Sequence, residues 1–250
     1  MRIISINVNQ FLQYEHWNEI SKSMYLEKNK EVLSVLNKQK LYGYLNQNEN
    51  DLIILHEVPS SLSTVVIKEF LIEVNERFNV IYPQRIKANF ITIAITKNLM
   101  WELDKEPYEN QKLTGVFLNR FLPLKNNELY ITGVHIPRID GFANGKVIPE
   151  NENANDFWED VIKHFKQNER HILIGDFNVD SDGTRQKSNY YRLCERARDI
   201  AFEFNKQNIN TFVGETRVDY AFVSSKIKAI SFEIIDTKLS DHCAIALEIE

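Results

Sequence analysis

Eight apolar runs of strand length recur along the 250-residue chain and constrain its fold more than any other feature. They are rich in Ile, Val, Phe and Tyr and are bounded by Asn, Asp, Gly or Pro, which is typical of buried β-strands. Strands that are buried on both faces need other layers above and below the sheet. The runs are Ile3–Val8, Leu52–Leu55, Phe90–Thr96, Leu129–His135, His171–Gly175, Val218–Val223, Ile230–Ile235 and Cys243–Ile249.

Amphipathic stretches of helical periodicity lie between these runs, at about 18–47, 62–77, 154–167 and 189–207. Phe157, Val161 and Phe165 illustrate the spacing of three and four residues. Residues 138–155 and 180–189 are rich in Asp, Asn and Gly, which predicts surface loops. No Pro/Gly/Ser-rich linker divides the sequence, so we expect residues 1–250 to form a single domain.

Composition narrows the class of protein. Hydrophobic residues make up 43% and the net charge is -5, which are ordinary values for a globular chain. No apolar run approaches the roughly 18 residues that cross a bilayer, so we expect no membrane span and a cytoplasmic location. The negative charge argues against broad electrostatic binding to nucleic acid but leaves room for a local basic groove. Cys194 and Cys243 are too few for a disulfide framework.

Polar side chains that can bind metal or phosphate gather where the apolar runs end. Each has an ordinary structural interpretation, because an acidic strand end is commonly solvated and Asp-x-Asn commonly forms a turn or caps a helix. Their recurrence in one chain weakens that interpretation. In extended backbone Asp176 and Asn178 would share a face, whereas the neighbours Asp241 and His242 would face opposite ways. The latter pair can serve one site only if the chain bends, or if another carboxylate orients His242.

Three familiar catalytic patterns are missing from the sequence. His56-Glu57 is not followed by a second His three residues after the Glu, since position 60 is Ser60, so it is not a metalloprotease helix. Neither a Gly-Lys-Ser/Thr phosphate loop nor a Gly-x-Ser-x-Gly elbow occurs.

The strand-end motifs resemble those of the endonuclease/exonuclease/phosphatase superfamily, which includes DNase I, and they occur in the family's order over nearly the whole chain. The resemblance implies an α+β fold, a four-layer α/β/β/α sandwich of two mixed β-sheets, and a phosphoesterase that depends on Mg²⁺ or Mn²⁺. The motifs that carry it are Ser5-Ile6-Asn7-Val8-Asn9, Ile54-Leu55-His56-Glu57, Val134-His135-Ile136-Pro137, Ile174-Gly175-Asp176-Phe177-Asn178, Arg217-Val218-Asp219-Tyr220 and Ser240-Asp241-His242.

The resemblance also implies roles for single residues. Glu57, Asn7 and Asp241 match positions at or near the metal, and Asn7, Asn178 and His135 match positions that contact phosphate. Asp176 would align or deprotonate the attacking water, and Asp219 would orient His242. Arg138 follows His135 by three residues and either holds a second phosphate or forms a plain salt bridge. Hard cations such as Mg²⁺ prefer carboxylate and amide oxygens, which agrees independently with this residue set.

Three departures from the family pattern put the substrate and the number of metal ions in question. His56 stands where Gln is commoner, Asn9 stands where nucleases often have Asp, and about 50 residues separate Asn7 from Glu57. We therefore expect an inserted helix or lid within residues 10–50. The favoured function is a nuclease that hydrolyses phosphodiesters by direct attack of water. A phosphatase or phosphodiesterase acting on a small-molecule or lipid-headgroup phosphate is the alternative, followed by an inactive binding module.

Overall fold

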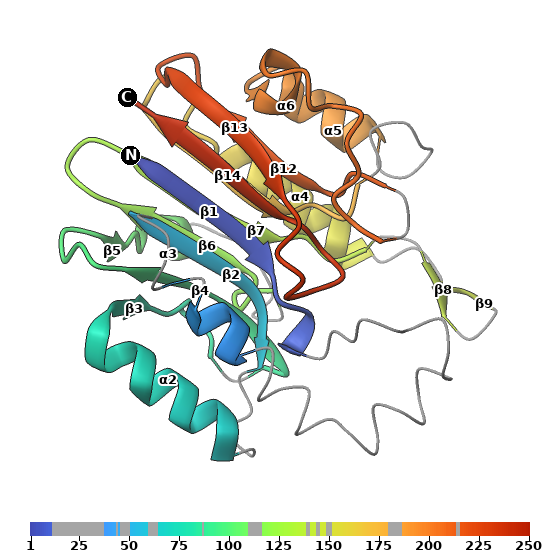
Figure 1. Ribbon diagram of the computed structural model, residues 1–250. Coiled ribbons are helices and arrows are strands. Elements are labelled where there is room, and N and C mark those ends of the chain that lie inside the picture. The colour runs from blue at the N-terminus through green and yellow to red at the C-terminus, as the bar shows by residue number, and fades with distance from the viewer. Residues whose placement is uncertain are drawn as a thin grey trace.

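The computed structural model describes residues 1–11, 38–43, 45, 51–59, 65–86, 88–109, 117–138, 141–143, 146–148, 152–179, 187–213 and 216–250. Two six-stranded sheets form its centre (Figure 1). The first sheet has the strand order β13-β14-β1-β2-β4-β3 and the second β11-β12-β10-β7-β6-β5. Each sheet is mixed, because β1 is parallel to β2 and β7 is parallel to β10 while the other pairs are antiparallel.

Each of the eight predicted runs overlaps a strand. The first sheet consists of β1 (Arg2–Asn7), β2 (Leu52–Pro59), β3 (Asn79–Ile81), β4 (Phe90–Thr96), β13 (Ala229–Ile235) and β14 (Ala244–Ile249). The second consists of β5 (Glu102–Leu103), β6 (Phe121–Lys125), β7 (Tyr130–His135), β10 (His171–Asp176), β11 (Arg198–Asp199) and β12 (Asp219–Val223). A separate hairpin of β8 (Gly141–Ala143) and β9 (Lys146–Ile148) projects from one side of the molecule in Figure 1.

Helices cover the outer face of each sheet. On the first sheet, Leu71 and Val74 of α2 (Val65–Arg77) join a core cluster with β1, β2 and β4. On the second, the outer core cluster contains residues of α3 (Glu106–Glu109), α4 (Glu152–His164) and α5 (Lys187–Cys194). A third cluster fills the space between the sheets and includes residues of α6 (Ile200–Glu203). The fold is therefore the expected four-layer α/β/β/α sandwich. Among the described residues, no helix has the length and apolar character needed to cross a membrane.

Several local expectations need correction. The stretch 189–207 is not one helix, because α5 ends at Cys194 and β11 intervenes before α6. The expected loop 138–155 contains the β8–β9 hairpin and the start of α4. β6 was not predicted, since Pro123 lies in its middle and proline is disfavoured inside strands. Residues 38–43 are helical, but most of the predicted helix at 18–47 and of the predicted loop at 180–189 lies outside the described residues.

The two sheets approach each other closely where His56 of β2 faces Gly175 of β10. A Cβ atom at Gly175 would lie 2.9 Å from the His56 ring and 2.0 Å from the backbone oxygen of Val134. Gly175 also has a φ of +148°, which side-chain-bearing residues rarely adopt. Glycine is therefore required at this position by both packing and backbone conformation.

We predict that Gly175→Ala lowers the free energy of unfolding by roughly 3 kcal/mol or more, because it adds overpacking to backbone strain. Gly43→Ala is the matched control, since Gly43 is helical and an added Cβ atom would meet nothing within 4 Å. That control should be neutral or stabilising by up to about 1 kcal/mol. Urea unfolding of both variants measures the difference. A Gly175→Ala protein as stable as the wild type would contradict the requirement for glycine.

Candidate active site

The inward-facing side chains of the central strands change from apolar to polar at one end of the sandwich. Along β1 the inward series is Ile3, Ser5 and Asn7, and along β10 it is Ile172, Ile174 and Asp176. This follows from the two-residue period of a strand, which keeps alternate residues on one face. Strand register then aligns Asp176 with His135 of β7 on one side and with Asp219 of β12 on the other. The sequence therefore places three predicted residues in one row across the second sheet.

Glu57 reaches this end of the sandwich through a bulge in β2. The register between β2 and β4 shifts between Leu55 and Val58, and Glu57 has a φ of +55°. A bulge turns a side chain away from the regular alternation, and strand bulges are common beside active sites. Glu57 is half-buried, and its Oε1 accepts a hydrogen bond from Nδ2 of Asn7 at 3.4 Å. Burial raises the pKa of Glu57, against the lowering effect of the Asn7 hydrogen bond.

Asp219 forms a buried hydrogen bond with His242, with 2.9 Å between Oδ2 and Nδ1. Nε2 of the same imidazole lies 3.9 Å from Oδ2 of Asp176. Burial lowers the pKa of His242, but the carboxylates of Asp219, Asp176 and Asp241 together outweigh burial and raise the pKa to about 10, with Asp219 contributing the most of the three. Burial, together with the neighbouring Asp219 charge, raises the pKa of Asp176 to about 7. The row thus holds an imidazolium between two carboxylates, one of which can accept a proton near neutral pH.

Asp241 and His242 serve the same cavity although they are adjacent in sequence. The chain bends through residues 238–241 before β14 begins, so the strict alternation of a strand does not apply. Ser240 stabilises the bend, because its Oγ donates to Oδ1 of Asp241 at 3.1 Å and accepts from the His242 N–H at 3.2 Å. The chain bends between these two residues and the preceding strand, and Asp219 also orients the His242 ring. Both of the arrangements that would let adjacent residues serve one site are therefore present.

Two asparagines bridge the carboxylates and the backbone. Nδ2 of Asn7 donates to Oδ2 of Asp176 at 2.9 Å, and Oδ1 of Asn7 accepts from the Asn9 N–H at 2.9 Å. Asn178 donates its backbone N–H to Oδ1 of Asp176 at 2.9 Å and its Nδ2 to the Ile136 carbonyl at 2.8 Å. Asn178 has a φ of +50°, so it follows Asp176 in a turn and not in the extended backbone that the sequence spacing assumed.

Arg120 is a site residue that the sequence analysis missed. Its guanidinium lies 4.6 Å from the ring centre of Phe90, and the Phe90 ring lies 5.4 Å from that of His135. Arg120 stands directly before β6, and β6 is antiparallel to β7, so the start of β6 meets the end of β7 at His135. Arg120 precedes its strand and does not follow one, so its place in the site depends on the antiparallel register of β6 and β7.

His135 and His242 differ in the charge of their imidazole rings. Burial and the neighbouring Arg120 lower the pKa of His135 well below its ordinary value, so its ring is neutral. Its Nε2 lies 3.4 Å from Oε1 of Glu57 and 3.6 Å from Oδ2 of Asp176. Among the residues that the structure describes, none is a hydrogen-bond partner of His135 Nδ1. The site therefore contains one cationic and one neutral imidazole.

These residues surround a cavity of about 500 Å³, a size that suits a small ligand. Of the nine predicted site residues, eight line it, and Asp219 lies behind His242. Arg138 is at its exposed margin. The lining residues are Asn7, Asn9, Gln10, Glu57, Phe90, Arg120, His135, Pro137, Arg138, Asp176, Asn178, Phe212, Asp241 and His242.

The donor set fits a hard divalent cation. Glu57 and Asp241 supply carboxylates to one cavity, and a cation would offset the cost of burying Glu57 as an anion. Asn7 would have to turn its amide oxygen toward the ion, because its nitrogen now faces the carboxylates. Asp176, Asp219 and His242 also lie close enough together to ligate a metal. A protonated His242 has no lone pair for a metal, so this trio is better suited to proton transfer.

Comparison with known proteins identifies the fold. No family model matches the sequence, and no curated protein matches it. Among solved structures, the 3′-5′ exonuclease NExo from Neisseria meningitidis matches with a TM-score of 0.67 at 11% identity, covering 100% of both chains. An AP endonuclease from Archaeoglobus fulgidus matches with a TM-score of 0.65 at 12% identity, covering 100% of this chain and 99% of that one. The chain thus has the same fold as these nucleases, which confirms the fold that the resemblance implied.

We predict that Asp219→Asn removes the positive charge of His242. Without this carboxylate, burial dominates, and the pKa of His242 should fall from about 10 to below 6.5. NMR titration of the imidazole Cε1–H resonance measures it directly. Asp241→Asn is the matched control, because Asp241 raises the pKa of His242 less than Asp219 does. A His242 that stays protonated at pH 8 in Asp219→Asn would show that another group holds the proton.

Proposed function

We propose that the protein is a divalent-metal-dependent phosphoesterase that hydrolyses phosphodiester bonds by direct attack of water, with nucleic acid as substrate. The observation that carries the proposal is the row in which Asp219 hydrogen-bonds to His242 and His242 lies 3.9 Å from Asp176. This row borders a cavity that contains two further carboxylates and two arginines. A phosphodiester repels anionic nucleophiles, so its hydrolysis needs a base for water together with positive charge facing the phosphate oxygens. The cavity offers both.

In this proposal Asp176 takes a proton from the water whose oxygen attacks phosphorus. Its pKa of about 7 suits a general base at neutral pH. The attacking oxygen forms a bond to phosphorus while the ester P–O bond on the far side breaks, with no covalent link to the protein. His242, held as a cation by Asp219, faces the phosphate oxygens on one side. Asn7, Asn178, His135 and Arg138 would contact the remaining oxygens, joined by Arg120.

Glu57, Asp241 and a reoriented Asn7 would hold Mg²⁺ or Mn²⁺. When bound, a divalent ion supplies charge stabilisation on the phosphate that these side chains alone cannot supply. The half-burial of Glu57 supports this role, because an unpaired carboxylate in that position is costly. We also propose that the single domain 1–250 contains the complete site.

Structural neighbours support a nucleic-acid substrate and leave a phosphatase as the second candidate. One solved structure of NExo from Neisseria is described as a 3′ phosphatase bound to product DNA hairpin, and matches this chain with a TM-score of 0.65 at 11% identity. Another is described as a 3′-5′ exonuclease. Since this fold carries both activities, a small-molecule or lipid-headgroup phosphate remains the alternative substrate. A catalytically inactive binding module would not need Asp219, His242 and Asp176 to lie in one row.

We predict that Glu57→Gln removes most Mg²⁺ or Mn²⁺ binding and nearly all phosphoesterase activity, because the amide cannot supply the anionic ligand. Isothermal titration calorimetry measures the metal affinity, and EDTA should abolish wild-type turnover. Glu102→Gln is the control, since Glu102 is an exposed acid on β5 with a side chain 70% accessible. If Glu57→Gln binds Mg²⁺ or Mn²⁺ with the wild-type affinity, or if turnover persists in EDTA, the assignment of Glu57 to a metal site is wrong.

The substrate class is tested with a panel of single- and double-stranded DNA, RNA, inositol phosphates and sphingomyelin. A nuclease should bind nucleic acid with a salt dependence of about -0.7 to -0.9 in log–log slope for each phosphate contacted. Arg138→Ala should flatten this slope by about one unit, because Arg138 is exposed at the cavity margin. Lys228→Ala is the control, since Lys228 pairs with Glu250 at the opposite end of the sheet.

A protein that neither binds nor cuts DNA or RNA in low salt with Mg²⁺ or Mn²⁺ would refute the nuclease proposal. Release of inorganic phosphate from a phosphomonoester under the same conditions would support the phosphatase alternative.

A further inference from the structure

A group of three polar side chains joins α4 to the second sheet, away from the candidate active site. Thr132 of β7 and His171 of β10 have only 1% and 0% of their surface exposed. Their neighbours Ile131 and Ile172 point between the sheets, so the two-residue period of a strand directs Thr132 and His171 outward, toward the helices. His164, at the C-terminal end of α4, completes the group, which we call the relay.

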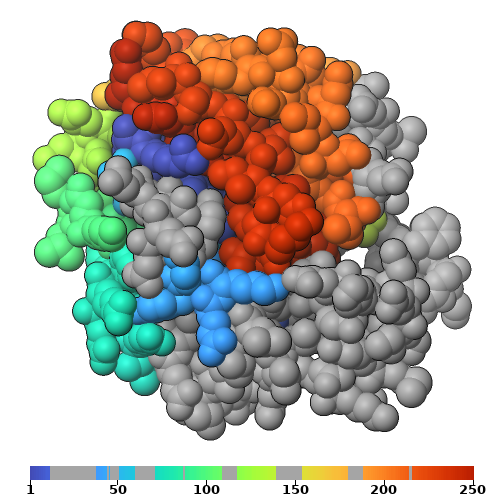
Figure 2. Space-filling view, viewed as in Figure 1, coloured from blue at the N-terminus to red at the C-terminus, as the bar shows by residue number. Residues whose placement is uncertain are grey.

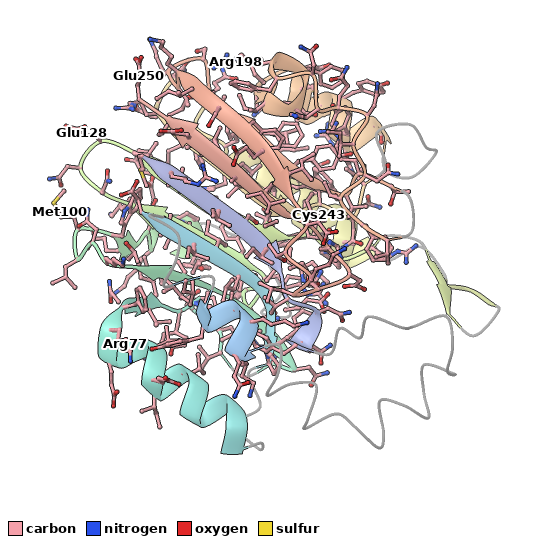
Figure 3. All side chains as sticks on the ribbon, viewed as in Figure 1. Arg77, Met100, Glu128, Arg198, Cys243 and Glu250 are labelled. Atoms are coloured by element: carbon pink, nitrogen blue, oxygen red, sulfur yellow. The ribbon has the colours of Figure 1, made fainter. Side chains whose placement is uncertain are left out.

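The relay and the candidate active site lie at opposite ends of the same strands. β7 and β10 begin near the relay and end at His135 and Asp176. In Figure 3 the labelled Glu128, in the turn before β7, marks the relay end of the sandwich, and Cys243, directly before β14, marks the end that holds the site. Figure 2 has the same view and shows β1 in blue and the C-terminal strands in red at its near surface, whereas α4 covers the second sheet behind them. The length of a strand thus separates the relay from the site residues.

The hydrogen bonds of the relay run in one direction. The Lys166 backbone N–H donates to Nδ1 of His171 at 2.9 Å, so this nitrogen carries no proton. A neutral imidazole then has its proton on Nε2, which lies 2.9 Å from Oγ1 of Thr132 and donates to it. The Thr132 hydroxyl in turn donates to Nε2 of His164 at 3.2 Å. His171 is therefore the Nε2–H tautomer and His164 the Nδ1–H tautomer.

The surroundings of the relay keep both rings neutral. Burial lowers the pKa of His171 well below its ordinary value and lowers the pKa of His164 to about 4, and the Lys166 ammonium acts on both rings in the same direction. Asp104 and Glu106 raise the pKa of His164, but Nζ of Lys166 already lies 3.8 Å from Asp104 and 3.1 Å from Glu106. Among the described residues, the ionisable groups that face the relay are Asp104, Glu106, Lys125, Tyr130 and Lys166.

We propose that the relay is an acid-sensitive latch, which holds the C-terminal end of α4 on the second sheet while both imidazoles are neutral and releases it when they take up protons. A protonated imidazole has two N–H donors and no acceptor. On His171 the added proton would face the Lys166 N–H, and on His164 it would face the Thr132 hydroxyl. The ring centres of the two histidines are 5.3 Å apart, so two charged rings would also repel each other.

The first test reads the tautomers directly in the wild-type chain. Long-range ¹H–¹⁵N NMR at pH 7 distinguishes a ring nitrogen that carries a proton from one that does not. His171 should carry its proton on Nε2 and His164 on Nδ1. Two rings with the same tautomer, or a ring that is protonated at pH 7, would overturn the directed relay.

The second test measures the latch in acid. Because the pKa of each histidine is lowered in the folded chain, the unfolded chain binds more protons below about pH 6.5, and stability falls as the pH falls from there toward 4. Each histidine raises the unfolding constant about tenfold per pH unit in this window. His164→Gln keeps an acceptor for the Thr132 hydroxyl but cannot titrate. Its unfolding constant should therefore rise about tenfold less per pH unit than that of the wild type between pH 6.5 and 4.5, as measured by urea unfolding.

Hydrogen exchange of the Lys166 amide reports the release of α4 itself, because this N–H is bonded to His171. Its opening constant should rise with acid in the wild type and rise less in His164→Gln. Lys163→Gln is the matched control, since Lys163 is exposed on the same turn of α4, and it should keep the wild-type pH dependence. If His164→Gln lowers stability by the same factor at every pH, or if its Lys166 amide opens with the wild-type pH dependence, the relay is a structural contact and not a latch. These measurements need neither metal nor substrate, so their outcome is independent of the proposed phosphoesterase function.

Discussion

The contact between His56 and Gly175 sets the distance between the sheets directly beneath the candidate site. Nε2 of His56 lies 2.9 Å from Oγ of Ser5, and Nδ1 lies 3.2 Å from Oγ1 of Thr92, so neighbours in its own sheet hold the ring. Burial lowers the pKa of His56 to about 3, which keeps the ring neutral. Asn7 belongs to the first sheet and Asp176 to the second, and their 2.9 Å hydrogen bond can form only at this separation. Without Gly175 the two halves of the site could not meet.

Local partners give chemically identical side chains different charges within this site. His242 gains a carboxylate partner in Asp219 and stays protonated, whereas His135 is neighboured by Arg120 and stays neutral. Asp176 and Asp219 are paired by register, and the Asp219 charge helps to raise the pKa of Asp176. His242 places positive charge between the two carboxylates. The protonation pattern thus follows from strand order and not from residue type alone.

The sequence predicted the eight strands and the residues that gather at their ends, because two-residue periodicity and strand-end position are local properties. It could not predict Arg120, whose place depends on the pairing of β6 with β7. It also misjudged Asn178, where the left-handed turn is set by hydrogen bonds to Asp176 and Ile136. The pairing between residues 211–213 and 241–243, which holds the chain beside His242, could not be predicted either, because it joins segments far apart in the sequence. Tertiary pairing, and not composition, decides each of these features.

Backbone strain is concentrated around the cavity. Among the described residues, the non-glycine residues with positive φ are Asn9, Gln10, Phe11, Glu57, Asn178, Asn205 and Lys238, and four of these seven line the candidate active site. Such conformations cost about 1–3 kcal/mol each and persist only where the surroundings impose them. Asparagine tolerates the left-handed region of backbone conformation, whereas glutamate does not, so the backbone strain at Glu57 is not reduced. A glycine would relax the bulge yet remove the carboxylate, so retaining glutamate there costs stability and keeps an acidic group facing Asn7 and His135.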